Sequence, residues 1–310
     1  MTEHPGDRRP DGPRRLDDLV LPFQIEGPGL RGRLVRLGDA VDTILKRHDY
    51  PPAVAALLAE ALALAATLSA ALKYEGIFTL QLKGDGPVRM LVTDVTSAGA
   101  IRGYAEVSGD LPDDKAIALS PVRSLVGKGY LAFTVDQGEH TERYQGIVEL
   151  IGDSLTECID HYFKQSEQFS AALQVTAGQN DAGKWRAGAM MLQRLPDQEA
   201  IVAIEERDEA WRRSVILMSS VTATELLDPV LAPAELLFRL FHEDGVRVYD
   251  QHMLAFGCRC SHERAARILA SLPRDEVEEL VVDGKVSVTC QFCNETQNFG
   301  ESEIAGLYEA

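Results

Sequence analysis

The chain has 310 residues, 45% of them hydrophobic, and a formal net charge of −17. Its length allows two domains, and its apolar content excludes a chain that is disordered throughout. The negative charge, with no segregated basic patch, argues against a nucleic-acid-binding protein, and no uninterrupted run of about 18 apolar residues predicts a membrane span.

The N-terminal third combines a polar tail with one long helix and several strands. Residues 1–15 are rich in Pro, Gly, Arg and acidic side chains, so we expect a disordered tail rather than a signal peptide, and a cytoplasmic protein. The segment 32–37 alternates like a strand. Pro51 and Pro52 then open a helix that is apolar on most faces, predicted to run to about residue 74 and to pack centrally.

The next segments predict mainly antiparallel strands. Gly-containing turns separate three expected strands at residues 76–82, 88–95 and 100–107. Further expected elements are hairpins and one helix, with strands at 130–136, 141–148, 169–177 and 185–192 and a helix at 154–165. We therefore predict an α+β fold, in which an N-terminal domain over residues 16–196 has a largely antiparallel sheet packed by helices.

Residues 197–250 predict a helical linker packed on the first domain. A helix is expected over residues 201–219, prolines follow at 229 and 233, and a short helix is expected over 234–241. The first helix has an apolar stripe among acidic side chains, consisting of Ile201, Ile204, Trp211, Val215, Ile216 and Met218. Such a stripe is either core in every state or a partner-binding surface once it is uncovered.

The last unit, residues 251–310, contains four of the five cysteines as a C-x-C pair and a C-x-x-C pair, namely Cys258, Cys260, Cys290 and Cys293. In a cytosolic chain this spacing predicts one zinc ion held by four thiolates. This unit has five basic and ten acidic residues, and this negative charge argues against a zinc module that binds nucleic acid. The fifth cysteine, Cys158, shares a helical face with apolar residues and is expected to be a buried, inert thiol.

The cysteine pattern permits both a structural zinc site and a redox switch. In a unit of this size, zinc binding supplies much of the folding free energy, about 10–16 kcal/mol in small zinc modules. Oxidation of the ligands would therefore unfold the unit, but spacing alone does not establish a switch. The sequence shows no constellation of paired acid and base groups that would indicate an enzyme. A zinc-stabilised enzyme, or an interaction protein with purely structural zinc, is the alternative.

Several motifs resemble those of the heat-shock protein 33 chaperones. The segments FGCRCSHER at residues 256–264 and CQFC at 290–293 resemble the redox module of that family. The resemblance extends upstream to about Leu19 and includes FTLQ at 78–81, RGYA at 102–105 and YFKQSEQ at 162–168. It covers nearly the whole chain.

This resemblance implies an ATP-independent holdase that is not an enzyme. In such proteins the zinc-bound reduced form is inactive, and oxidation forms the disulfides Cys258–Cys260 and Cys290–Cys293. Zinc is then released, and the module and linker lose structure. The protein, commonly a homodimer in this state, binds unfolding client proteins under oxidative stress. We expect the apolar stripe of the linker to lie beneath the module and to become part of the client-binding surface.

Overall fold

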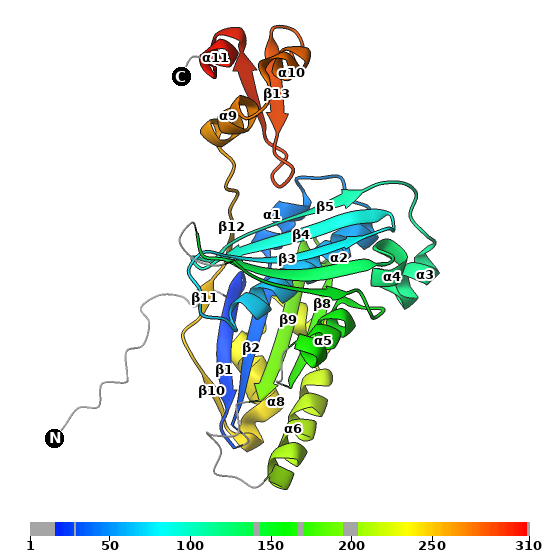
Figure 1. Ribbon diagram of the computed structural model, residues 1–310. Helices are drawn as coiled ribbons and strands as arrows, with labels where there is room; N and C mark the ends of the chain where they lie inside the picture. The colour runs from blue at the N-terminus through cyan, green and yellow to red at the C-terminus, as the bar shows by residue number, and fades with distance from the viewer. Residues whose placement is uncertain (1–15, 28, 139–142, 167–169, 195–203, 309–310) are drawn as a thin grey trace, which may run out of the picture.

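The computed structural model describes residues 16–27, 29–138, 143–166, 170–194 and 204–308. The predicted tail and Ile201 lie outside these ranges. The described residues confirm the α+β class, with two six-stranded sheets that are almost entirely antiparallel and a two-stranded sheet near the C-terminus (Figure 1). The domain boundaries expected from the sequence remain predictions.

The first sheet has the strand order β10-β1-β2-β9-β8, with β11 also paired to β1. Its strands are β1 (Leu19–Ile25), β2 (Leu30–Leu37), β8 (Ala171–Gln179), β9 (Trp185–Arg194), β10 (Val246–Val248) and β11 (His252–Met253). The second sheet has the order β12-β5-β4-β3-β6-β7. Its strands are β3 (Ile77–Gly84), β4 (Val88–Thr96), β5 (Ala100–Val107), β6 (Gly129–Asp136), β7 (Tyr144–Glu149) and β12 (Ala255–Phe256).

The largest core lies around α2 (Pro52–Ser69), which contacts strands of both sheets. This helix is long and apolar enough to cross a membrane, but 78% of it is buried inside the protein, as expected for a helix between two layers. It ends at Ser69 rather than near residue 74, because the chain must turn into β3. Gly76, at φ 134°, makes that turn, and the Tyr74 hydroxyl donates to the Val95 carbonyl at 3.1 Å.

Four further helices complete the body around the two sheets. They are α1 (Asp39–Leu45), α3 (Asp114–Leu119), α4 (Pro121–Leu125) and α5 (Leu155–Ser166). The buried Cys158 lies on α5, where burial raises the pKa of its thiol to about 11. A thiol in this state is a poor nucleophile at neutral pH, in agreement with an inert core residue.

The linker helices form a second core on the opposite face of the first sheet. They are α6 (Ile204–Ser219), α7 (Ala223–Leu227) and α8 (Pro233–Phe241), followed by a short 3₁₀ turn (His242–Asp244). Phe23, Leu34 and Met190 of the sheet pack there with Met218 and Phe241 of the linker. The linker therefore covers an apolar sheet face that would otherwise contact water.

A buried arginine holds the linker on the sheet. Arg36 of β2 is fully buried and donates hydrogen bonds to the carbonyls of Glu225, Leu226 and Asp228 at 2.8–3.0 Å, and also to that of Leu231. These carbonyls lie at and just beyond the end of α7, where helical partners are lacking. Burial lowers the pKa of Arg36 to about 10, so the side chain is still charged at neutral pH.

An extended segment, residues 246–256, connects the linker to the cysteine-containing module, and we call it the strap. It contains β10 and β11, which pair with β1, and β12, which pairs with β5. The strap thus adds an edge to each of the two large sheets, which the sequence analysis did not predict.

The cysteine-containing module follows the strap. Its elements are α9 (His262–Ala270), α10 (Arg274–Glu279), β13 (Lys285–Thr289), β14 (Thr296–Gly300) and α11 (Glu301–Gly306). They enclose a small core of their own, composed of Ala265, Leu269, Val277, Val286, Phe299 and Ile304. Among the described residues, six side chains of this core are buried and the apolar side chains around them are partly buried, so the module has little apolar burial of its own to stabilise it.

Candidate metal centre and its docking surface

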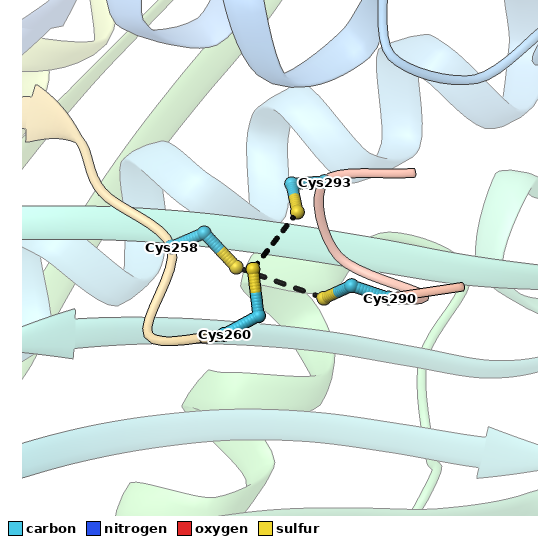
Figure 2. A group of neighbouring side chains, drawn as sticks. All are labelled: Cys258, Cys260, Cys290 and Cys293. Atoms are coloured by element: carbon cyan, nitrogen blue, oxygen red, sulfur yellow. Dashed lines mark hydrogen bonds between the residues drawn. The ribbon is translucent and has the colours of Figure 1, made fainter. Parts of the chain in front are cut away.

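Two short loops bring the four cysteines together. Cys258 and Cys260 lie between β12 and α9, and the helix starts directly after them because the Ser261 side chain caps it. Cys290 and Cys293 lie in the turn between β13 and β14. Figure 2 shows the four side chains pointing toward one another, with all four sulfur atoms within 4.8 Å of one another.

The sulfur geometry fits a tetrahedral zinc ion. The Sγ atoms of Cys258 and Cys290 are 3.7 Å apart, and those of Cys260 and Cys293 are 3.3 Å apart (Figure 2). Zinc–sulfur bonds of about 2.3 Å in a tetrahedron place the sulfurs about 3.8 Å from each other. Four thiolates with no nitrogen or oxygen ligand are also the donor set of closed zinc sites. The residues present therefore suit one zinc ion.

The thiols of the cluster share protons unequally. For Cys258, burial opposes ionisation, but hydrogen bonds from the Cys260 backbone and from the neighbouring thiols outweigh it and lower its pKa to about 7. For Cys260, burial and the nearby negative sulfur raise the pKa. Cys258 is therefore the thiol of this pair that ionises more readily, and binding of a metal by the four sulfurs would release the protons that the thiols still carry.

Charged residues next to Cys258 and Cys260 dock the module on the second sheet. Asp94 of β4 is buried, and its Oδ2 atom accepts from Arg102 of β5 at 2.7 Å and from Arg259 at 2.6 Å. Arg259 is the residue between the first two cysteines. The Arg102 guanidinium also reaches the Cys258 sulfur at 3.9 Å. The buried carboxylate therefore joins a residue of the module to the sheet.

The second cysteine pair is docked in the same way. Phe292, between Cys290 and Cys293, lies under the Arg102 guanidinium, whose central carbon is 3.8 Å from the ring centroid. Just after α1, Arg47 donates to the Cys293 carbonyl at 3.0 Å and pairs with Glu295. The residues between the cysteines are thus also residues that hold the module in place. A change in the geometry of either cysteine pair would move a docking contact.

The predicted linker stripe lies elsewhere. The module is at one end of the molecule and α6 is at the other, so for the described residues of the stripe the expectation that the module covers it is wrong (Figure 1). Met218 is buried, Trp211 and Val215 are half-buried, and Ile216 is 69% exposed. Ile204 begins the described helix. Buried members of the stripe face the first sheet because α6 packs there rather than under the module.

Arg36, Asp94 and Arg102 were not identified as paired residues from the sequence. Each is a charged residue inside a segment with the alternation of a buried strand, and a charge at such a position requires a partner. That signal could have marked all three as paired residues. It could not have identified the partners, which are up to 195 positions away along the chain.

Comparisons with known proteins agree with the motifs. The chain matches the family model described as Hsp33 protein over residues 18–300. The 33 kDa chaperonin of Caulobacter vibrioides is 42% identical over 287 residues, which are 90% of this chain and 93% of that protein. The 33 kDa chaperonin of Escherichia coli K12 is 37% identical over 291 residues, 94% of each. A crystal structure of the 33 kDa chaperonin (heat shock protein 33 homolog) from Thermotoga maritima shares the fold, with a TM-score of 0.79, 24% identity, and coverage of 94% of this chain and 97% of that one.

Proposed function

The chain belongs to the Hsp33 family of chaperones, and from this premise we propose that it is a redox-regulated, ATP-independent holdase of the cytoplasm. Reducing thiol pools there would keep Cys258, Cys260, Cys290 and Cys293 reduced. When bound, zinc would fix the four thiolates in one tetrahedral arrangement and stabilise the module. In this state the linker stays on the first sheet and the protein is inactive.

The proposed activation is oxidation within each cysteine pair. The pairs are Cys258–Cys260 and Cys290–Cys293. The two thiols of each pair give two electrons to one molecule of hydrogen peroxide and become a disulfide, and the peroxide is reduced to two molecules of water. The metal ligands are consumed, and the module loses most of its folding free energy. The observation that carries this proposal is that Arg259 and Phe292, the docking residues, lie between the paired cysteines. Oxidation would therefore release docking as well as metal.

Loss of the docked module would free the strap and then the linker. The strap is joined directly to α8 through the 3₁₀ turn, and α6 to α8 cover an apolar face of the first sheet. Uncovering that face would create a large apolar patch of the kind that binds partners. We propose that this face, with Trp211, Val215 and Met218 of the released linker, binds partly unfolded proteins, and that the active form is a homodimer.

Light scattering from a thermally unfolding client tests the proposal. Zinc-loaded reduced protein and peroxide-treated protein are compared at equal concentration, and zinc content and hydrophobic dye fluorescence are measured in both samples. We expect only the oxidised protein to suppress aggregation, to have lost zinc and to bind more dye. Equal suppression by both forms would contradict redox control. Suppression by neither would assign the zinc site a purely structural role.

A further inference from the structure

The outer edge of β1 is occupied by the protein's own strap. One side of β1 pairs with β2 along Leu19–Ile25, and the other side pairs with β10 and β11. Main-chain bonds make this contact. The amides of Tyr249 and Leu254 donate to the carbonyls of Pro22 and Asp18 at 2.9 and 2.7 Å, and the Glu26 amide donates to the Gly245 carbonyl at 2.9 Å.

The strap then crosses to the edge of β5. There the amides of Ala255 and Gly257 donate to the carbonyls of Gly99 and Ile101, both at 3.0 Å. Between its two anchoring points the strap borders a cavity of about 420 Å³, lined in part by His252, Met253 and Leu254. Hydrogen bonds to the two sheet edges therefore hold the strap at a place where side-chain packing beneath it is incomplete.

The strap shows which kind of segment fits these edges. Val246 and Val248 pack partly against the core beneath the linker, and the alternating residues Arg247 and Tyr249 are exposed. Farther along, the buried Leu254 and the half-buried Phe256 belong to the core around α2, while Ala255 between them is exposed. An extended chain with apolar side chains at alternate positions satisfies both edges.

The sequence of β1 restricts what can pair with it. Pro22 provides no amide toward the strap, and the pairing of β10 and β11 is interrupted at this position. A proline on an edge strand opposes long, regular pairing with a second copy of the same chain. Short extended segments, such as β10 and β11, still pair on either side of it.

We propose that, once the strap separates, the edges of β1 and β5 bind short extended segments of unfolding proteins by main-chain hydrogen bonding. This inference rests on the proposed function, because oxidation must first release the strap. The client segment takes the place of residues 246–256 and places apolar side chains where Val248 and Leu254 were. Main-chain pairing is largely independent of side-chain identity, so one edge accepts many clients.

A synthetic peptide with the sequence of residues 245–257 tests main-chain pairing. One version carries N-methyl groups on Tyr249 and Leu254, whose amides face β1. A matched version carries them on Val248 and Met253, whose amides point away from β1 by the alternation of the strand. We expect the unmodified and the matched peptides to bind the oxidised full-length protein and to displace a bound unfolded client. The edge-methylated peptide should bind at least tenfold more weakly.

A second measurement uses two glycines with the same backbone strain. Gly99 has φ 88°, and a Cβ there would lie 2.1 Å from the Met253 carbonyl oxygen, whereas Gly109 has φ 89° and no atom within 4 Å of such a Cβ. The Gly99→Ala variant should therefore have a lifted strap and should bind the unmodified peptide without oxidant. The Gly109→Ala variant should not bind this peptide without oxidant.

Three results would overturn the inference. Equal binding of the two methylated peptides would mean that side chains, not the main chain, are recognised. Failure of the peptide to displace a client, while the oxidised protein still suppresses aggregation, would place client binding elsewhere and leave the proposed function intact. If the oxidised protein suppresses no aggregation, the proposed function fails and this inference fails with it.

Discussion

Replacing Arg36 by methionine should raise the population in which the linker is detached, without changing a cysteine. The Arg36 guanidinium donates to four carbonyls at and beyond the end of α7, and its side chain is fully buried. Methionine fills much of the same volume but donates no hydrogen bond. The four carbonyls lose their charged partner and remain in a position that water reaches poorly while α7 stays on the sheet.

The size of the effect follows from these contacts. A hydrogen bond to a charged group contributes about 1.5–3 kcal/mol, and removing one partner of a buried charged network costs about 3–5 kcal/mol. The lower of the two ranges applies here, because the carbonyls form hydrogen bonds with water once α7 lifts off the sheet. A local loss of about 3 kcal/mol corresponds to a rise of roughly a hundredfold in the population of the open linker.

Hydrogen exchange of the zinc-loaded, reduced variant measures this population. We expect the amides of Ala223–Leu227 and of α8 after Pro233 to exchange about a hundredfold faster, while those of His262–Ala270 in the module are unchanged. Arg31→Met, at an exposed position of the same strand, should leave exchange as it is. Arg36→Lys, with its charge but fewer donors, should give an intermediate effect. Unchanged exchange in the linker of Arg36→Met would refute the reasoning.

Three further predictions concern the module and the remaining cysteine. Cys290→Ser should lower zinc affinity and speed exchange across residues 262–306 without oxidant; full zinc retention in a metal assay would remove Cys290 from the ligand set. Cys158→Ser should leave activation by peroxide intact, because this thiol is buried and its pKa is raised to about 11. Loss of activation in the light-scattering assay would show a redox role for it. The neutral amide of Asp94→Asn offsets the charge of neither Arg102 nor Arg259, so this change should weaken docking by about 1–3 kcal/mol while zinc stays bound. Equal zinc content with faster exchange in Ala100–Val107 is the expected result, and unchanged exchange there would contradict the docking role of Asp94.

Local sequence patterns predicted the individual elements well. Alternating apolar residues located the strands from β3 to β6, and the uniformly apolar segment after Pro51 correctly predicted a central helix. The paired spacing of the cysteines predicted that they would meet, and their sulfur atoms do lie within 4.8 Å of one another. These successes share one physical cause, because periodicity and ligand spacing are properties of short segments.

The arrangement of the elements in space was harder to predict from the sequence than the elements themselves. Apolar periodicity does not identify the partner of a strand edge, so the strap and the division into two large sheets were missed. The predicted position of the module, beneath which the linker stripe was expected to lie, was wrong for a related reason. Its docking depends on Asp94, Arg102 and Arg259, and the Arg259–Asp94 ion pair connects positions 165 residues apart. Such contacts leave no periodic trace in the sequence.

The position of the module limits how cysteine chemistry can control the linker. The module contacts β4, β5 and the end of α1, and α6 lies at the opposite end of the molecule (Figure 1). For the described residues of the linker, the module therefore does not cover α6 directly. The strap is the covalent path between them, and its hydrogen bonds with β1 and β5 lie along that path. Undocking can free the strap from β5 first and from β1 next, while Arg36 still holds α7. Control of the linker then involves contacts at both ends of this path, among them the Asp94 contact at the module and the contacts of Arg36 and Arg186 with α7, and weakening either end should raise the population of the open form.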